Sequence, residues 1–389
     1  MIDNPLAKLA PQLFGEYPKS FIKLVKNVSL APGENLEEIK ILLWKAYQFG
    51  NRYHEGQKRL SGKPYFSHCI AVANTLACWR MDTITIIAGL LHDTIEDTDA
   101  TLEEISESFG SDLANLVDGL TKISGISYSS RKEKQAGNYM KMLLSVAQDL
   151  RVIIIKFADR LHNMETIKYM PRIKRHRVAI ETRDIYVPLA HRLGMSAVKS
   201  QLEDMVFSVL NPSGFKEMET KIKSSKKQRE KFIAKSIKPV EQELNQYNIF
   251  PSVYGRAKSY SSIYGKMISR NKDFSEIYDL YAIRIIVDKI ENCYLALGIV
   301  HNKYLPVQNR FKDFIATPKT NGYQSIHTTV IGPDGQKIEI QIRTTEMEET
   351  AEIGVAAHWL YKENKSSDID KNIKWLRDLL EILQNESTN

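Results

Sequence analysis

The chain has 389 residues, enough for two or three domains, and its hydrophobic content of 43% supports real cores. Its three cysteines form no CxxC pair, which excludes a disulfide framework and indicates a reducing compartment. The N-terminus does not resemble a signal peptide and no apolar run reaches the roughly 18 residues of a membrane span, so we expect a cytoplasmic protein with no membrane partner. The formal charge of +7 favours an anionic partner or substrate.

The first predicted helix covers residues 34–56, where apolar side chains recur at spacings of three and four. A loop then begins at Lys58, and Ser67 stands where it can cap the helix that follows. His68 lies at the start of that helix. A histidine in this position is more often structural than a metal ligand, and only a second metal-binding region elsewhere in the chain would favour the ligand.

Residues 92–97, which read His-Asp-Thr-Ile-Glu-Asp, follow an apolar run and concentrate metal-binding side chains. If they form one helix, His92 and Glu96 lie four apart, as do Asp93 and Asp97, so all four share one side. Imidazole and carboxylate groups suit a divalent transition metal, and the remaining carboxylates could orient a water. A solvated helix end with N-cap signals for the next helix explains the same residues.

Two more helices are predicted over residues 101–110 and 111–123, followed by a polar, basic segment over 124–137 that is typical of a mobile loop. Residues 152–158 are apolar on all sides and should form a buried helix that ends at Asp159. A buried aspartate is costly unless it is paired or binds a metal. Asp159 is therefore expected either to be paired or to bind a metal.

His68, His92, Asp93 and Asp159 would together supply four ligands from three helices. Neutral imidazoles and carboxylates without a thiolate argue against a structural zinc site. They favour a catalytic site for an ion such as Mn²⁺, Fe²⁺ or Zn²⁺. Asn163, four residues after the last ligand, should lie on the same helix face.

This ligand pattern is similar to that of the HD phosphohydrolase superfamily. Residues 92–97 (HDTIED) and 159–163 (DRLHN) narrow the resemblance to the hydrolase domain of RelA/SpoT-type alarmone enzymes, over about residues 47–202. The resemblance implies an all-α domain that removes the 3′ pyrophosphate of (p)ppGpp, with Mn²⁺ held by the four ligands. Glu96 and Asp97 would orient or deprotonate the attacking water.

The same resemblance assigns substrate contacts. Arg59 would stack on guanine, Ser61 would lie near the base, and Asn163 would lie near the ribose. The chain departs from the family pattern at Leu60, where lysine is frequent, and at Cys69, where proline commonly follows the histidine. The first departure would weaken a phosphate contact, and the second should be tolerated.

The second half of the chain is predicted to begin with a helical connector that carries many lysines over residues 221–235. Beyond residue 240, Arg256, Lys258 and Lys266 recur along a predicted loop and helix. Their spacing is typical of a solvated surface. It also suits a triphosphate, whose charge needs several cations.

Two strands are predicted in this half. Residues 281–287 are rich in β-branched side chains, and residues 337–343 alternate, with isoleucines facing the core and Glu339 on the other face. Asp279 and Glu339 are the most plausible carboxylates for Mg²⁺, which prefers few protein oxygens together with substrate phosphates. Between the strands an Asn-Gly turn presents Tyr323, either as a stacking platform for a base or as an ordinary packed aromatic.

Four strings make this half similar to the synthetase domain of the same family, a nucleotidyltransferase-like fold around a mixed sheet. They are residues 254–258 (YGRAK), 310–313 (RFKD), 321–327 (NGYQSIH) and 339–343 (EIQIR), within a likeness over about residues 240–362. The resemblance implies transfer of pyrophosphate from ATP to the 3′-hydroxyl of GDP or GTP. The RFKD form is the one associated with bifunctional members.

The resemblance also implies roles for single residues of this half. Asp279 would hold Mg²⁺, and Glu339 would bind metal or activate the 3′-hydroxyl. Tyr323 would stack on the guanine, with Asn321 nearby. The remaining residues would contact substrate. Arg256, Lys258 and Lys266 would hold the ATP phosphates, Lys312 and His327 would contact the acceptor phosphates, and Arg310 of the RFKD string would bind substrate.

We therefore expect a multidomain α plus α/β protein. Its segments are a hydrolase domain over residues 1–200, a helical connector over 201–240, a synthetase domain over 241–362 and a C-terminal amphipathic helix and tail over 363–389. Because family members usually continue into regulatory domains, contact with the ribosome or tRNA is expected to need domains beyond this chain.

Two intact residue sets with opposed chemistry predict a bifunctional enzyme of the stringent response, acting on ATP, GDP, GTP, ppGpp and pppGpp. Since both activities at full rate would only waste ATP, ligand binding at one site is expected to disfavour the other. Two alternatives stay open: one retained activity beside a degenerate half, or a basic RNA-binding protein that uses residues 168–177 and 221–235. Buried acids such as Asp159 argue against the RNA-binding alternative.

Overall fold

The computed structural model describes residues 17–354, apart from residues 32, 122–139, 141–143, 225, 257–258, 272–273 and 275–281. The chain forms two compact units, the first reaching Pro171 and the second covering Arg172–Val355. None of the described helices is both long and apolar enough to cross a membrane. The expected domain limits stay a prediction, and the segments 124–137 and 363–389 lie outside the described residues.

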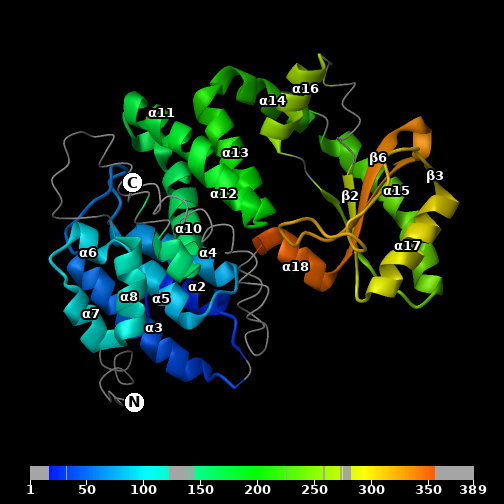
Figure 1. Ribbon diagram of the computed structural model, residues 1–389. Helices are drawn as coiled ribbons and strands as arrows, with labels where there is room; N and C mark the ends of the chain where they lie inside the picture. The colour runs from blue at the N-terminus through cyan, green and yellow to red at the C-terminus, as the bar shows by residue number, and fades with distance from the viewer. Residues whose placement is uncertain are drawn as a thin grey trace, which may run out of the picture. The chain divides into compact units, whose positions relative to one another are not determined.

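The first unit is built from packed helices (Figure 1). They are α2 (Lys19–Asn27), α3 (Leu36–Tyr53), α4 (Phe66–Cys78), α5 (Thr83–Leu91), α6 (Thr94–Asp97), α7 (Leu102–Phe109), α8 (Ser111–Leu120), α10 (Arg151–Glu165) and the 3₁₀ turn η1 (Ile167–Tyr169). The helices predicted over residues 34–56, 101–110 and 111–123 are confirmed as α3, α7 and α8.

Local side-chain chemistry explains where these helices begin. Thr101 and Glu104 form a reciprocal capping box that satisfies two amides at the start of α7. The prediction that Ser67 caps α4 is wrong. That helix already includes Phe66, and the Ser67 hydroxyl donates to the Pro64 carbonyl at 2.6 Å. The Ser67 hydroxyl is therefore bound to a loop carbonyl and does not cap the helix.

Helix α10 carries the apolar segment that crosses the first unit. The prediction for residues 152–158 is confirmed, since all of them except Lys156 are buried. The prediction that this helix ends at Asp159 is wrong, because the helix continues to Glu165. The aspartate is therefore held in mid-helix, where the backbone on both sides is hydrogen-bonded within the helix.

The helical conformation is interrupted between α5 and α6, and this interruption determines where the site residues lie. Helix α5 ends at Leu91 and α6 begins at Thr94, so His92 and Asp93 occupy a turn between two helices. The prediction that residues 92–97 share one side of a single helix is therefore wrong. The turn separates the histidine and its neighbouring aspartate from the acidic pair on α6.

The second unit starts with helices and continues into a sheet flanked by further helices (Figure 1). Its helical elements are α11 (Arg172–Glu181), the π-helix η2 (Thr182–Tyr186), α12 (Val187–Arg192), α13 (Ser196–Leu210), α14 (Pro212–Ser224), α15 (Lys226–Gln246), α16 (Tyr260–Arg270), α17 (Ile290–Lys303), the 3₁₀ turn η5 (Pro333–Gly335) and α18 (Thr345–Ile353). Helices α13, α14 and α15 cover the segment for which a helical connector is predicted.

Six described strands form one mixed sheet in the order β1-β2-β6-β5-β3, and β4 pairs with β5 beside this path. They are β1 (Ser252–Arg256), β2 (Ala282–Val287), β3 (Leu305–Pro306), β4 (Lys312–Asp313), β5 (Ile326–Ile331) and β6 (Lys337–Thr344). Strands β2 and β6 run parallel, and the other pairs are antiparallel. The expected fold class, helices first and a mixed sheet later, is confirmed.

The alternation predicted for β6 holds, but the strand is covered on both faces. Ile338, Ile340 and Ile342 are buried in the core formed with α15 and α17. On the other face Gln341 and Arg343 are also buried, with 2% and 1% of their surface exposed, because α18 packs there. The polar face of β6 is therefore a packed layer and not a solvated surface.

Gly354, directly after α18, has a φ of +58° and lies against the turn between α12 and α13. A Cβ atom there would lie 2.3 Å from the Leu193 carbonyl oxygen and 2.7 Å from the Met195 nitrogen. We expect Gly354→Ala to lower the free energy of unfolding of the second unit by about 2–4 kcal/mol, because backbone strain adds to a clash with fixed atoms. Urea unfolding followed by circular dichroism measures this loss.

Gly335→Ala is the matched control for this substitution. Gly335 also has a positive φ, of +70°, but a Cβ atom there would meet nothing within 4 Å. Its replacement should therefore cost only the backbone strain, about 1–2 kcal/mol. Equal losses in the two variants would contradict the steric role of Gly354.

Candidate functional site

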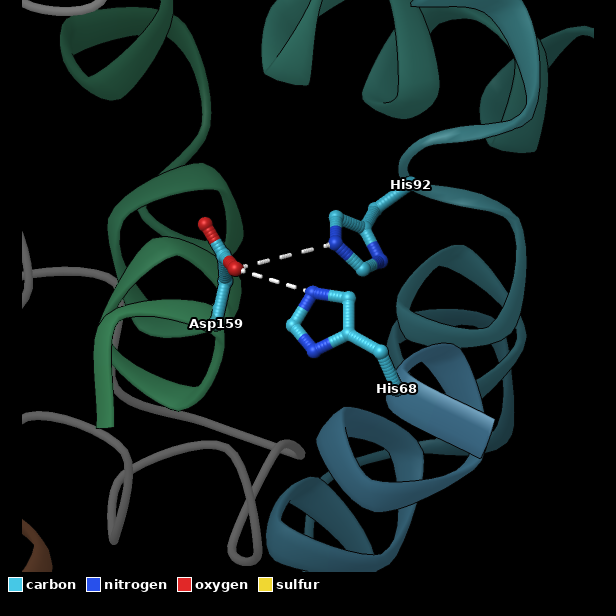
Figure 2. A group of neighbouring side chains, drawn as sticks. All are labelled: His68, His92 and Asp159. Carbon is cyan, nitrogen blue, oxygen red and sulfur yellow. Dashed lines mark ion pairs between the residues drawn. The ribbon is translucent and has the colours of Figure 1, made fainter. Parts of the chain in front are cut away.

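Four side chains converge in the first unit. His68 comes from the first turn of α4, His92 and Asp93 from the turn after α5, and Asp159 from α10. Nε2 of His68 lies 3.1 Å from Oδ1 of Asp159 and 3.6 Å from Oδ2 of Asp93. Nε2 of His92 lies 3.2 Å from Oδ2 of Asp93 and 3.9 Å from Oδ1 of Asp159. Figure 2 shows both rings directed at Asp159, so the structure brings the predicted ligand set together.

The outer nitrogens of both rings are held by other groups. Nδ1 of His92 lies 2.9 Å from the Gly89 carbonyl, to which it donates, so Nε2 is left for the centre. Nδ1 of His68 lies 2.6 Å from Nδ1 of His162. The ligand atoms of His68, His92 and Asp159 all lie within 4.8 Å of one another. Oriented imidazoles and convergent carboxylates are the donor set that a divalent transition metal requires.

The electrostatics of this cluster favour a positive charge between the two carboxylates. Burial opposes the charged form of His92, but Asp93 and Asp159 outweigh it and raise the pKa of His92 to about 9. Burial also opposes the charged forms of both aspartates, yet the histidines hold the pKa of Asp93 and of Asp159 well below the usual range. Burial lowers the pKa of His68. A divalent cation would replace the proton on His92, as metal binding to histidine generally does.

Cys69 also lies close to the centre, with its sulfur within 4.8 Å of ligand atoms of His92 and Asp93. It is fully buried, and burial followed by the charge of Asp93 raises the pKa of the Cys69 thiol well above its ordinary value. The thiolate, which is the form that binds metals, is thereby disfavoured. The oxygen and nitrogen ligands are the better donor set.

The second acidic pair, Glu96 and Asp97, is exposed on α6. Asp97 is connected to the centre through Tyr65, whose hydroxyl lies 2.5 Å from Oδ2 of Asp97 and 2.9 Å from Oδ2 of Asp93. Burial, together with both carboxylates, raises the pKa of the Tyr65 phenol far above its ordinary value, so it stays protonated and donates. Tyr65 and His162 are absent from the predicted site, although each stands three positions from a predicted ligand.

The predicted substrate-binding residues of this unit are partly connected to the ligands. Nη2 of Arg59 donates to Oδ1 of Asn163 at 2.7 Å, and Nδ2 of Asn163 donates to Oδ1 of Asp159 at 2.6 Å. The predicted shared helix face of Asn163 and Asp159 is thereby confirmed. Ser61 lies half-buried in the turn after Arg59, and Leu60 is 65% exposed. This side of the site thus offers a guanidinium, an amide and an exposed apolar side chain.

In the second unit, four of the residues predicted from the sequence lie next to one another. They are Lys312 on β4, His327 on β5, Glu339 on β6 and Tyr323, which precedes β5. The Tyr323 hydroxyl lies 2.8 Å from Nε2 of His327, whose Nδ1 lies 3.9 Å from Oε1 of Glu339. Lys312 pairs with His327 across β4 and β5. The Phe314 ring packs edge-on against Tyr323 and His327. The arrangement places a carboxylate, an imidazole, an ammonium group and an aromatic ring on one part of the sheet.

Asn321 is bound to the protein itself. Its Nδ2 donates to the His191 carbonyl at 3.1 Å, and its Oδ1 accepts from the Tyr323 amide at 3.4 Å. The predicted turn is present, with Gly322 at a φ of +74°. The side chain of His191 itself is exposed.

Several predicted residues of the synthetase half cannot be placed in this site. Lys258 and Asp279 lie outside the described residues, as does the side chain of Arg256. Lys266 is half-buried on α16, and Arg310 is exposed before β4. Their roles stay predictions.

A buried network that the sequence pattern does not reveal supports Glu339. Oε1 of Glu339 accepts from Nε2 of Gln341 at 2.9 Å, and Oε1 of Gln341 accepts from Nη2 of Arg343 at 3.1 Å. Nε of Arg343 lies 2.9 Å from Oε2 of Glu348 on α18, which also pairs with Arg284 on β2. The only sequence signal is the shared strand face of positions 339, 341 and 343. The network connects the Glu339 carboxylate to α18.

Two family models match separate parts of the chain. A model described as "HD domain" matches residues 46–196, which include the four converging side chains. A model described as "Region found in RelA / SpoT proteins" matches residues 255–366.

Whole-chain comparisons find relatives that are longer than this chain. A "GTP pyrophosphokinase" of Myxococcus xanthus is 48% identical over 358 residues, which are 91% of this chain and 47% of that protein. The "Bifunctional (p)ppGpp synthase/hydrolase SpoT" of Escherichia coli K12 is 43% identical over 350 residues, which are 89% of this chain and 50% of that protein. The chain thus spans about half the length of the curated relatives it matches.

Among solved structures, a match described as "A metazoan ortholog of SpoT hydrolyzes ppGpp and plays a role in starvation responses" is 26% identical. It covers 43% of this chain and 93% of that chain, with a TM-score of 0.36.

Proposed function

This chain belongs to the RelA/SpoT family, and on that premise we propose that it is a bifunctional guanosine alarmone enzyme. It makes (p)ppGpp from ATP and GDP or GTP, and it hydrolyses (p)ppGpp to GDP or GTP plus pyrophosphate, both in the cytoplasm. The observation that carries the proposal is the convergence of His68, His92, Asp93 and Asp159, a donor set that fits a divalent ion.

In the hydrolase reaction, a water oxygen forms a bond to the phosphorus on the 3′ oxygen, and the bond between that phosphorus and the 3′ oxygen breaks. Glu96 and Asp97 orient the water and take its proton, and this proton then passes to the 3′ oxygen, which leaves as a hydroxyl. The four ligands would hold a divalent ion, Mn²⁺ in our proposal, which would acidify water and screen the phosphate charge. Arg59 stacks on guanine, with Ser61 near the base and Asn163 near the ribose.

In the synthetase reaction, the 3′ oxygen of GDP or GTP forms a bond to the β-phosphorus of ATP. The bond from the β-phosphorus to the oxygen that bridges it to the α-phosphorus breaks, and AMP leaves. Glu339 takes the hydroxyl proton, Tyr323 stacks on guanine, and Lys312 and His327 hold the acceptor phosphates. Asp279 and Glu339 would hold Mg²⁺, which would screen the ATP phosphates. The remaining substrate contacts are proposed for Arg256, Lys258, Lys266, Arg310 and Asn321.

Paired nucleotide chromatography on the full chain tests both halves. One sample holds ATP, GDP and Mg²⁺, and the other holds ppGpp and Mn²⁺. We expect ppGpp and AMP in the first sample, and GDP and pyrophosphate in the second. Dialysis against EDTA should lower hydrolysis by at least about 100-fold, and Mn²⁺ should restore it, because the ion supplies several kcal/mol of transition-state stabilisation.

If the expected products do not form in one of the samples, the corresponding activity is contradicted. If both samples are silent and the chain binds RNA with a steep salt dependence, the RNA-binding alternative replaces the proposal. Hydrolysis that survives EDTA would contradict the metal centre while leaving the substrate assignment intact. The opposed regulation of the two activities stays a prediction.

A further inference from the structure

The Tyr65 hydroxyl lies between two carboxylates with different proposed roles. Its oxygen is 2.9 Å from Oδ2 of the metal ligand Asp93 and 2.5 Å from Oδ2 of Asp97, which orients water. A neutral phenol carries one proton, which it donates to one acceptor or shares between two. The hydroxyl therefore joins the turn after α5 to the end of α6.

The Tyr65 ring is held by contacts that do not involve its hydroxyl. It stacks on the His54 ring, with centroids 4.9 Å apart and an interplanar angle of 11°. Its amide donates to the Gln57 carbonyl at 2.9 Å. The Gln57 side chain lies 2.8 Å from Nδ1 of His54 and donates to the Asp97 carbonyl at 2.7 Å. A phenylalanine ring would keep the same place, so that only the hydroxyl is lost.

We propose that Tyr65 is a positioning residue for hydrolysis, whose hydroxyl holds the Asp97 carboxylate toward the metal ligand Asp93. The inference rests on the proposed hydrolase activity. Asp97 is exposed, and the like charge of Asp93 favours a side-chain position turned away from it. A phenol proton between the two oxygens offsets that repulsion and keeps the water-orienting group beside the reacting phosphate.

The test compares Tyr65→Phe with Tyr53→Phe in the full chain. Tyr53 is a matched control because its hydroxyl donates to Glu104 at 2.6 Å, away from the ligands. We expect Tyr65→Phe to lower kcat for ppGpp hydrolysis at saturating Mn²⁺ by about 10- to 100-fold, with KM changed by less than about threefold. Mn²⁺ binding, followed by the electron paramagnetic resonance of the free ion, should change by less than about threefold. Tyr53→Phe should match the wild type.

A double-variant cycle separates positioning from a general structural effect. In an Asp97→Asn background, Tyr65→Phe should lower kcat by less than about twofold, since the group that it holds is already removed. A full additional loss in that background, or a loss of Mn²⁺ binding that accounts for the fall in kcat, would overturn the proposal. So would wild-type kinetics in Tyr65→Phe. An intact chain that does not hydrolyse ppGpp would instead overturn the proposed hydrolase function, and this inference with it.

Discussion

Asp159→Asn is expected to lower ppGpp hydrolysis by about 10³-fold or more while leaving ppGpp synthesis within about twofold. The asparagine keeps the shape of the side chain but removes the charge that lies 3.1 Å from His68 and 3.9 Å from His92. A bound ion contributes several kcal/mol to the transition state, and each 1.36 kcal/mol corresponds to a factor of ten in rate. Initial rates of both reactions, measured by nucleotide chromatography on one preparation, provide the comparison.

Synthesis by the same preparation shows that the second unit is folded, and an unchanged circular dichroism spectrum would show that the helices of the first unit are retained, so a loss confined to hydrolysis then reports on the site. Asp112→Asn is the matched control, because Asp112 is an exposed aspartate in the first turn of α8. It should retain both activities. Mn²⁺ binding should weaken in Asp159→Asn only. A variant that keeps more than about a tenth of wild-type hydrolysis would remove Asp159 from the proposed metal centre.

Hydrophobic periodicity locates the helices that carry the predicted ligands of the first unit, because His68, His92 and Asp159 each adjoin an apolar segment that becomes a buried helix. It could not reveal the break after Leu91, since neither glycine nor proline marks that position. Periodicity therefore predicts one side of a single helix for His92, Asp93, Glu96 and Asp97. In the structure the first two lie in a turn and the last two lie on α6.

The partners of these ligands could not be predicted for a different reason. His68 meets His162 across 94 positions of the sequence, and Tyr65 meets Asp93 across 28. Side chains that touch only after the helices pack leave no periodic signal, because periodicity reports which face is buried and not which atoms meet there. Such contacts have to be read from the fold.

Strand β6 of the second unit also shows that periodicity does not predict tertiary contacts. The isoleucine alternation predicts the core face, and the structure confirms it. The burial of Arg343 depends on Glu348 from the next helix, which local strand periodicity does not include. A charged residue at that position has the pattern of a solvated face, so tertiary packing overrides the interpretation from sequence.

Glu339→Gln is expected to lower ppGpp synthesis by about 10³-fold, with hydrolysis unchanged within about twofold. In the proposed reaction Glu339 accepts the proton of the 3′-hydroxyl and contributes to Mg²⁺ binding, and a glutamine can do neither well. General base catalysis alone is worth about 10²–10⁴-fold. The bond from Gln341 and the chain of contacts to Arg343 hold the position of the carboxylate, so an isosteric amide should fit without loss of stability.

Glu346→Gln is the matched control for this variant, because Glu346 is an exposed glutamate in the first turn of α18. Both activities should persist in it. Rates measured at several Mg²⁺ concentrations separate the two roles of Glu339. If its main role is to bind the ion, high Mg²⁺ restores part of the synthesis, whereas loss of the base leaves the rate low at every concentration. Synthesis in Glu339→Gln above about a tenth of the wild-type rate at every Mg²⁺ concentration, including the lowest, would contradict both roles and move the search for the synthetase carboxylate to Asp279.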